Sequence, residues 1–387
     1  MLAAKSMRAD RSSERRPPII RLSRAAGRIL LVAACLVLAI NVLAVAAILG
    51  EGVVGEITRG SGDKRAALPN YREFDWAKTH FREFAELSTD YESFYGWRRL
   101  PYQGQTINID ENGIRRTFQD PGARPTRTIA IFGGSTAWGS GSDDDHTIAS
   151  LFARARPDYR AYNFGETAHT AQQNLNFLVK TLAEGFRPDV VVFYNGSSEI
   201  NKCRIGLDAF SDLNEPRIRE LLDDDAHSLQ GSKAFWSLVY PAKLFWDKLQ
   251  PSLHARLYGP QDRRDCAENP EKAAMIARTL FWDWMAAKRL VEGYGGRFVA
   301  ALQPVAYFGQ PRTDHITIDA ELMRQYEAVY SQYDRLLQDE FPALAPNFLD
   351  LRRAFDGDEY LYIDADHASP GGNLIVAARI GEHLSAP

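Results

Sequence analysis

The chain has 387 residues, 45% hydrophobic and 25% charged, a composition typical of a globular protein with one large domain or two. Its net charge is −4, but residues 1–28 carry a charge of +6, which leaves −10 for the rest of the chain. This negative charge argues against nucleic-acid binding by the main body.

After this basic tail, which we expect to be cytoplasmic, residues 29–50 form a run of 22 residues without a charge (ILLVAACLVLAINVLAVAAILG). This length predicts a helix that spans a bilayer. The positive-inside rule then leaves the N-terminus in the cytoplasm and places the rest on the periplasmic or extracellular side of the inner membrane. A cleaved signal peptide is the alternative, because Ala44, Val45 and Ala46 have the small-x-small form of a cleavage site. The long basic tail and apolar run favour a retained single-pass anchor.

The next two segments connect this helix to a larger domain. Residues 51–70 are rich in glycine and predict a tether. Residues 71–125 are aromatic and irregular, and they predict a short helix and a hairpin that pack onto the domain at residues 126–387. No internal repeat is visible.

From Thr128 onward, short apolar runs alternate with helical patterns. The apolar runs are TIAIFG, YRAYNFG, PDVVVFYNG and GRFVAALQPV. Helical patterns cover residues 148–156, 170–186 and 271–293, and one long helix is predicted over Ala320–Glu340. This alternation predicts an α/β fold, a flavodoxin-like three-layer α/β/α sandwich with a buried parallel sheet. Ligands of such sheets bind beyond the carboxyl ends of the strands.

Residues 201–272 interrupt the alternation with an aromatic-rich helical pattern, AFWSLVYPAKLFWDKL. It predicts either a helical insertion packed on the core or a lid or membrane-facing patch over the site. Cys203 and Cys266 lie in this insertion, and Cys35 lies in the apolar segment. Outside the cytoplasm the pair can form a disulfide, although two separate buried thiols fit the sequence equally well.

Two short motifs carry the chemistry. Ser135 follows two glycines in IFGGSTAWGSGS, which by itself predicts only a strand-to-helix turn. In YIDADHASPGGN, Asp364 lies three residues before His367, so one turn brings both side chains to the same side, whereas Asp366 is expected to point elsewhere. A serine nucleophile needs a base, and the base needs an orienting acid. Ser135, His367 and Asp364 supply these three groups.

Four blocks occur in a fixed order along the chain: GGST, NFGETAHTAQQ, YNGSSE and DADHASPGGN. This order resembles the SGNH/GDSL hydrolase superfamily, specifically its membrane-anchored bacterial members, over residues 126–387. The resemblance implies that Ser135 is the nucleophile, that Asp364 and His367 complete the triad, and that Gly165 lends its N–H to the oxyanion hole. It also implies an esterase that acts on small acyl esters of carbohydrate or lipid without a metal or cofactor.

The third block departs from the pattern of this superfamily, which is usually G-x-N-D or G-x-N-E. Here Ser198 stands where the asparagine would donate a hydrogen bond to the oxyanion. We expect an oxyanion hole built from the N–H groups of Ser135 and Gly165, with Ser198 as a weak third donor, and therefore a slow enzyme. Asn195 cannot replace it, since it lies three residues earlier and on the opposite face of an extended strand.

Other patterns are assigned no chemistry. Position 137 is Ala, so the G-x-S-x-G turn of α/β-hydrolases is absent. The DDDH run at residues 143–146 predicts a solvated loop before a helix cap rather than a cation site. We expect His169 to be structural.

Two alternatives to the esterase remain open. The same triad would serve a polysaccharide O-acetyltransferase, and an inactive SGNH domain would serve as a scaffold in an envelope assembly. The sequence identifies no protein partner.

Overall fold

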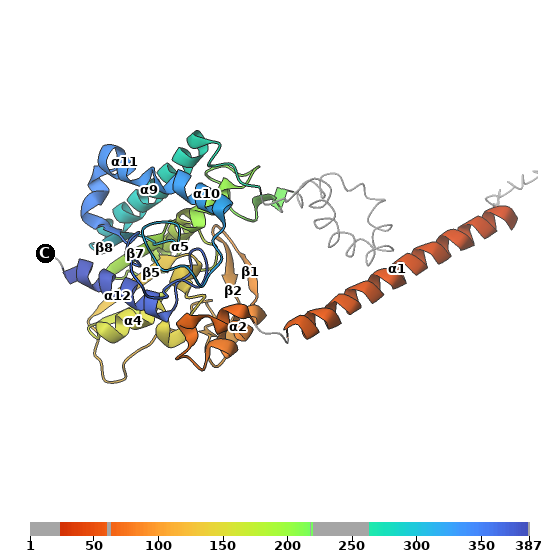
Figure 1. Cartoon of the computed structure of the whole chain (residues 1–387), viewed down its shortest axis with the longest axis horizontal. Helices are drawn as coiled ribbons and strands as arrows, with labels where there is room; N and C mark the ends of the chain where they lie inside the picture. The colour runs from red at the N-terminus through yellow and green to blue at the C-terminus, as the bar shows by residue number, and fades with distance from the viewer. Residues whose placement is uncertain (1–23, 60–62, 217, 220–262, 386–387) are drawn as a thin grey trace, which may run out of the picture. The chain divides into compact units, whose positions relative to one another are not determined.

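The computed structural model describes residues 24–59, 63–216, 218–219 and 263–385 (Figure 1). The chain divides into two units, residues 1–54 with 228–257 and residues 55–227 with 258–387. The aromatic-rich pattern predicted within the insertion lies outside the described residues.

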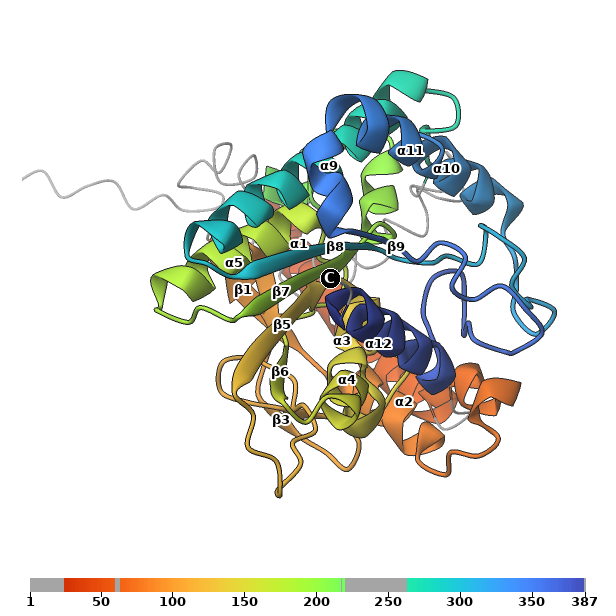
Figure 2. The ribbon, with the colours of Figure 1, turned by 90° about the vertical axis from the view of Figure 1, so that its left-hand side faces the viewer.

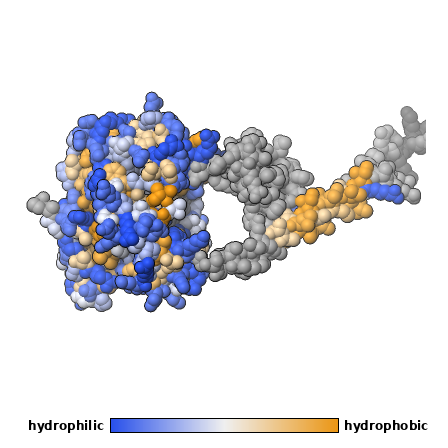
Figure 3. All heavy atoms as spheres, in the orientation of Figure 1, coloured by the Kyte–Doolittle hydropathy of each residue, from blue (hydrophilic) through white to orange (hydrophobic). Residues whose placement is uncertain are grey.

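Helix α1 (Arg24–Arg59) contains the apolar segment. Its stretch Gly27–Ala47 is long and apolar enough to cross a membrane, and it is coated with apolar side chains (Figure 3). Length and composition therefore identify α1 as a candidate single-pass anchor or signal sequence. The helix continues through residues 51–59, so the first half of the predicted tether is helical.

The larger unit is built on a five-stranded parallel sheet with the order β6-β5-β7-β8-β9. In chain order this is 2-1-3-4-5, the flavodoxin-like order, so the predicted fold class is confirmed. The four predicted apolar runs form the first four strands, and a fifth strand follows. Their bounds are β5 Arg127–Gly133, β6 Tyr159–Asn163, β7 Val190–Asn195, β8 Arg297–Leu302 and β9 Phe348–Asp350.

Helices cover both faces of this sheet (Figure 2). Alternate residues of each strand point to opposite faces, so Phe132 and Phe193 join one apolar core and Ile131 and Val192 join the other. The first core is covered by α5 (Ala171–Ala183), α9 (Pro270–Gly293) and α10 (Ala320–Tyr330). The second core is covered by α4 (Ile148–Ala155) and α12 (Pro370–Ser385).

The prediction of a single long helix over Ala320–Glu340 is wrong. Helix α10 ends at Tyr330, and the chain turns before a short α11 (Tyr333–Arg335) and a π-helical turn, η5 (Leu336–Glu340). The turn allows Tyr330 and Tyr333 to be buried in the same core. A 3₁₀ segment, η6 (Pro342–Asn347), then leads into β9.

The residues before the sheet form the short helix and hairpin expected there. Two 3₁₀ turns, η1 (Lys64–Ala67) and η2 (Pro69–Tyr71), lead into α2 (Ala77–Glu86). Two antiparallel pairs follow, β1 (Thr89–Glu92) with β2 (Gly96–Arg99) and β3 (Tyr102–Gln103) with β4 (Asn108–Ile109). Trp97 donates to the carbonyl of Thr167, which joins the hairpin to the loop after β6.

A disulfide joins Cys203 and Cys266, whose Cα atoms are 5.2 Å apart and which are separated by 63 residues in sequence. Cys203 ends η4 (Ser198–Cys203), the 3₁₀ segment that follows β7, and Cys266 precedes α9. Closing a loop of this length stabilises a fold by roughly 4 kcal/mol in the chain-entropy model. The bond therefore fastens the base of the insertion to the segment that carries Ser198.

Candidate active site

The first polar loop of the site follows β5, where α3 (Ser135–Trp138) begins directly after two glycines. A Cβ on Gly133 would clash with the carbonyl oxygen of Tyr194, and a Cβ on Gly134 would clash with Ser198 Oγ. The glycines are therefore required because the end of β5 lies against the end of β7. This close approach places Ser198 beside the residue that precedes Ser135.

The structure brings Ser135, His367 and Asp364 together from segments more than 200 residues apart in sequence. Ser135 Oγ lies 2.7 Å from His367 Nε2, and the Nδ1 atom of the same ring lies 2.8 and 2.9 Å from the two carboxylate oxygens of Asp364. A ring nitrogen held by a carboxylate on one side and facing a hydroxyl on the other is the geometry that activates a serine.

The tight loop that carries His367 is held by Asp364 itself. Asp364 Oδ1 accepts the backbone N–H groups of His367 at 2.9 Å and of Asp366 at 3.2 Å. The N–H of Ile363 also donates to the carbonyl of His367 at 2.9 Å. One carboxylate thus fixes both the backbone turn and the ring that the turn presents.

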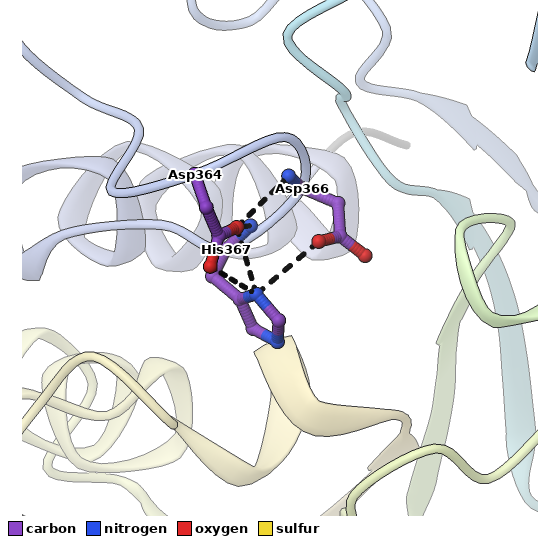
Figure 4. A group of neighbouring side chains, drawn as sticks. All are labelled: Asp364, Asp366 and His367. Atoms are coloured by element: carbon purple, nitrogen blue, oxygen red, sulfur yellow. Dashed lines mark hydrogen bonds and ion pairs between the residues drawn. The ribbon is translucent and has the colours of Figure 1, made fainter. Parts of the chain in front are cut away.

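Asp366 does not point elsewhere, and that expectation is wrong. Its Oδ1 lies 3.2 Å from His367 Nδ1, so two carboxylates flank the same ring nitrogen (Figure 4). The other oxygen, Oδ2, accepts a hydrogen bond from Ser197 Oγ. The physical reason is that these residues form a turn that curls around the ring, and adjacent side chains in such a turn can converge.

The electrostatics follow from this arrangement. Burial alone lowers the pKa of His367, but the charges of Asp366 and then Asp364 outweigh burial and raise this pKa well above its usual value. Burial likewise raises the pKa of Asp364, yet the charge of His367 and the hydrogen bonds from its ring and backbone hold it well below its usual range. The site therefore favours an imidazolium beside an ionised Asp364.

Gln303, at the end of β8, connects the two catalytic loops and was not predicted. Its Oε1 accepts a hydrogen bond from Thr136 Oγ1 at 3.0 Å, and its Nε2 donates to the carbonyl of Asp366 at 3.2 Å. The side chain is buried. Its position directly after an apolar run was the available signal, because polar residues at strand ends face the site in this fold.

Arg115 supports the turn that follows Ser135 and was also missed. The residue is 1% exposed, and its guanidinium donates to the carbonyls of Trp138 and Gly139 at 3.0 and 2.7 Å and of Ser142 at 2.5 Å. Its Nε pairs with Asp144 at 3.0 Å. A pair of arginines in an irregular segment gives no sequence signal for this role.

Gly165 is not placed as we expected for an oxyanion donor. Its N–H donates to Asn163 Oδ1 at 3.1 Å, and a Cβ there would clash with the backbone nitrogen of Trp138. It packs beneath α3 and does not line the cleft that contains Ser135. Ala168, which has a φ of 62°, lines the cleft instead. Within the described chain, the Ala168 N–H has no hydrogen-bond partner.

The third block agrees better with expectation. Ser198 lines the same cleft as Ser135. Asn195 instead lies near α9, where its Oδ1 is 3.4 Å from Trp284 Nε1, and the residue is buried. The acid of this block, Glu199, accepts the N–H groups of Ala171 and Gly196 and so joins the loops after β6 and β7.

The cleft has a volume of about 410 Å³, within the range of small-molecule sites. Arg65, Phe84 and Arg99 line it from the segment before the sheet. Leu322 and Tyr326 of α10 line it from the other side.

The remaining candidates have structural roles. In the DDDH run, Asp143 caps a short turn, η3 (Asp144–His146): its Oδ1 accepts the backbone N–H of His146 at 3.0 Å and lies 2.5 Å from the Nδ1 atom of the same residue. His169 is buried, its Nε2 lies 3.0 Å from the carbonyl of Trp97, and burial lowers its pKa to about 3.

Asp364, Asp366 and His367 form a cluster of groups of the kind that can bind a metal ion. The ligand atoms of Asp364, Asp366 and His367 lie within 4.8 Å of one another, close enough to be considered for a cation. The hydrogen bonds and ion pairs among them, together with the contact from His367 to Ser135, already account for their arrangement. We therefore assign them no metal.

No protein-family model and no curated protein matches the sequence. Among solved structures, the chain is similar to a carbohydrate acetylesterase family member from Sinorhizobium meliloti, with 14% identity and a TM-score of 0.34 over 67% of this chain and 97% of that one. It is also similar to a member of the lipolytic protein G-D-S-L family from Veillonella parvula, with 10% identity and a TM-score of 0.36 over 66% of this chain and 96% of that one. A third similar structure is an acetyl xylan esterase, with 13% identity and a TM-score of 0.34 over 66% of this chain and 99% of that one. Because these identities and TM-scores are low, the chemistry below rests on the geometry of the site.

Proposed function

We propose that the chain is a serine esterase that hydrolyses small acyl esters of carbohydrate or lipid. The observation that carries this proposal is the hydrogen-bonded series from Ser135 Oγ through His367 to Asp364. The first and last of the four sequence blocks that resemble SGNH hydrolases supply these same residues. An inactive scaffold would not need this series to be intact.

The proposed reaction has two steps. In the first, neutral His367 takes the proton of Ser135 Oγ as the oxygen attacks the ester carbonyl, and the imidazolium then gives that proton to the leaving alcohol. In the second, His367 takes a proton from water as the water attacks the acyl-serine, and the proton returns to Ser135. Asp364 stabilises the imidazolium in both steps, which fits its lowered pKa.

The proposed oxyanion hole consists of the N–H groups of Ser135 and Ala168 and the hydroxyl of Ser198. Ala168 replaces Gly165 in this role because it lines the cleft and its N–H has no partner in the part of the chain that the structure describes. The left-handed conformation of Ala168, rare for a residue with a Cβ, supports a functional reason for the strain.

Replacing Ser198 tests how much its hydroxyl contributes. We expect Ser198→Ala to lower kcat by less than about tenfold, since loss of a full oxyanion donor costs about 10²–10³ and a serine hydroxyl reaches less far than an amide. Ser198→Asn should leave kcat unchanged or raise it. Loss of turnover in a folded Ser198→Asn protein would contradict the alignment of the third block.

Labelling with a fluorophosphonate tests the proposed function directly. We expect the full-length wild-type chain to be labelled on Ser135 and to hydrolyse 4-nitrophenyl acetate, because an activated serine attacks both reagents. Ser135→Ala should do neither, while Ser331→Ala, an exposed serine at the end of α10, should behave as the wild type. An unlabelled but folded wild-type chain would contradict the proposal.

We further propose that α1 is a retained membrane anchor and that the catalytic unit lies outside the cytoplasm. The basic tail before α1 supports this orientation. A periplasmic reporter fused after Pro387 should be active in a bacterial host, and a cytoplasmic reporter should be inactive. Activity of the cytoplasmic reporter alone would reverse the topology, and release of the body from washed membranes would favour cleavage.

A further inference from the structure

We propose that Asp366 is a second acid of the site, a positioning residue that shares the Nδ1 side of His367 with Asp364 and ties that ring to the loop after β7. The inference rests on the proposed esterase function. It goes beyond a single orienting acid, since Asp364 alone completes the triad.

The two oxygens of Asp366 serve different neighbours. Oδ1 lies 3.2 Å from His367 Nδ1, and Oδ2 accepts the hydroxyl of Ser197 and lies 3.4 Å from the hydroxyl of Tyr326 (Figure 4 shows the former contact). The hydroxyls of Ser197 and Tyr326 are themselves 2.9 Å apart. The carboxylate therefore closes a small polar cluster rather than projecting into solvent.

Each member of this cluster is fixed by a different element. Ser197 directly precedes Ser198 in the loop after β7, Tyr326 belongs to α10, and the Asp366 carbonyl accepts Gln303 Nε2 from the end of β8. Ser197 and Tyr326 are 4% and 5% exposed, so water competes little for their hydroxyls. Asp366 thus links the histidine loop to the loop that carries Ser198.

Among the residues that the structure describes, Asp366 and Asp364 are the carboxylates whose charges act on the imidazole. Four tyrosines interact electrostatically with Asp366, and burial, the leading cause, raises the pKa of each, so they are uncharged near neutral pH: Tyr194, Tyr307, Tyr326 and Tyr362. On the cationic side, Arg65 interacts with Asp364, and Arg264 interacts with Tyr326. Arg99 also lines the cleft, and its charge faces Glu166.

Two carboxylates around one ring have a measurable consequence. His367 must lose its proton before it can act as a base, and both negative charges hold that proton on the ring. In the wild type, the pH profile of kcat/KM should therefore have an acid limb whose midpoint lies above the usual histidine pKa of about 6.5. Removing one charge should move the limb toward lower pH.

The test is the pH dependence of kcat/KM for Asp366→Asn, which keeps the shape of the side chain, removes its charge and replaces one acceptor oxygen by an NH2 donor. We expect the midpoint of the acid limb to fall by about one pH unit, since an opposite charge at this distance shifts a titration by about 1–3 units. Activity at low pH relative to the plateau should therefore rise, while KM changes little. Asp358→Asn, at an exposed carboxylate, is the matched control and should leave the profile unchanged.

Ser197→Ala and Tyr326→Phe separate charge from anchoring. Both keep the carboxylate but remove a hydroxyl partner, so we expect the acid limb to move less than in Asp366→Asn while kcat falls. If Asp366→Asn lowers kcat without moving the limb, the residue is merely structural and the inference is wrong.

A titration of His367 by NMR in the full-length chain, with ring-labelled histidine, distinguishes this inference from the proposed function. We expect the His367 titration to shift to lower pH in Asp366→Asn. If the wild type neither hydrolyses esters nor reacts with the fluorophosphonate but this shift occurs, the esterase proposal fails. The pairing of Asp366 with His367 then still stands. An unshifted titration in a folded Asp366→Asn protein overturns the inference even if the chain is an esterase.

Discussion

Replacing Ser135 by Ala is expected to lower kcat for ester hydrolysis by about 10⁴–10⁶-fold, the largest effect among the substitutions considered. The hydroxyl at 2.7 Å from His367 Nε2 is the only nucleophile proposed for the site, and no acyl-enzyme can form without it. KM should change little, because the lining of the cleft is retained. Steady-state kinetics with 4-nitrophenyl acetate measure both constants.

His367→Ala should cost nearly as much as Ser135→Ala, and the double variant should be little worse than either single one. Residues that act as one unit show this non-additivity, because the remaining rate comes from binding and the oxyanion hole alone. Substantial hydrolysis by either single variant, with an intact melting transition, would contradict the triad. Additive losses in the double variant would show that the two side chains act independently.

The core of the fold could be predicted from the sequence because its signals are local. The strands are continuous apolar runs, since both faces of a parallel sheet are buried, and the helices between them have the period of 3.6 residues. Ser135 and Ser198 could be placed on one edge because parallel strands end at the same edge. Asp364 could be paired with His367 because three residues span about one turn.

The errors at the site have conformational causes. Gly165 was assigned because the resemblance places an oxyanion donor at the glycine of the second block. In the structure this glycine packs under α3, and the alanine three residues later adopts the left-handed conformation. Asp366 was expected to point away from His367 because adjacent residues of a helix face different directions, but the segment that contains it is a turn. The contact between Asp366 and Ser197 joins residues 169 positions apart, so no local sequence pattern predicts it.

The supporting role of the segment before the sheet is also a long-range property. No local pattern around Arg115 indicates that its guanidinium reaches the turn after Ser135, more than twenty residues away. Its partner Asp144 lies in the DDDH run, for which we expected a solvated loop. Asp144 is instead buried at 4% exposure and accepts hydrogen bonds from Asn108 and Arg115.

Replacing Arg115 by Met is therefore expected to destabilise the fold by about 3–5 kcal/mol, the typical result of removing one partner of a buried ion pair. The methionine fills much of the volume, but it removes the charged donor from three carbonyls and from Asp144. Asp144 keeps its hydrogen bond from Asn108 but loses the positive charge that balances its own. Because two of these carbonyls belong to the turn after Ser135, kcat should fall as well. Denaturant unfolding of the wild type and the variant measures the first effect, and esterase kinetics below the transition measure the second.

Arg116→Met is the matched control, since the neighbouring guanidinium is 59% exposed and lies 3.6 Å from a half-exposed Asp145. A surface pair of this kind contributes about 0–1 kcal/mol, so the free energy of unfolding should hardly change. Adding Asp144→Asn to Arg115→Met should restore part of the lost stability, because the uncompensated buried charge is then removed. Equal effects at positions 115 and 116, or no recovery in the double variant, would show that Arg115 does not stabilise the turn through its buried charge.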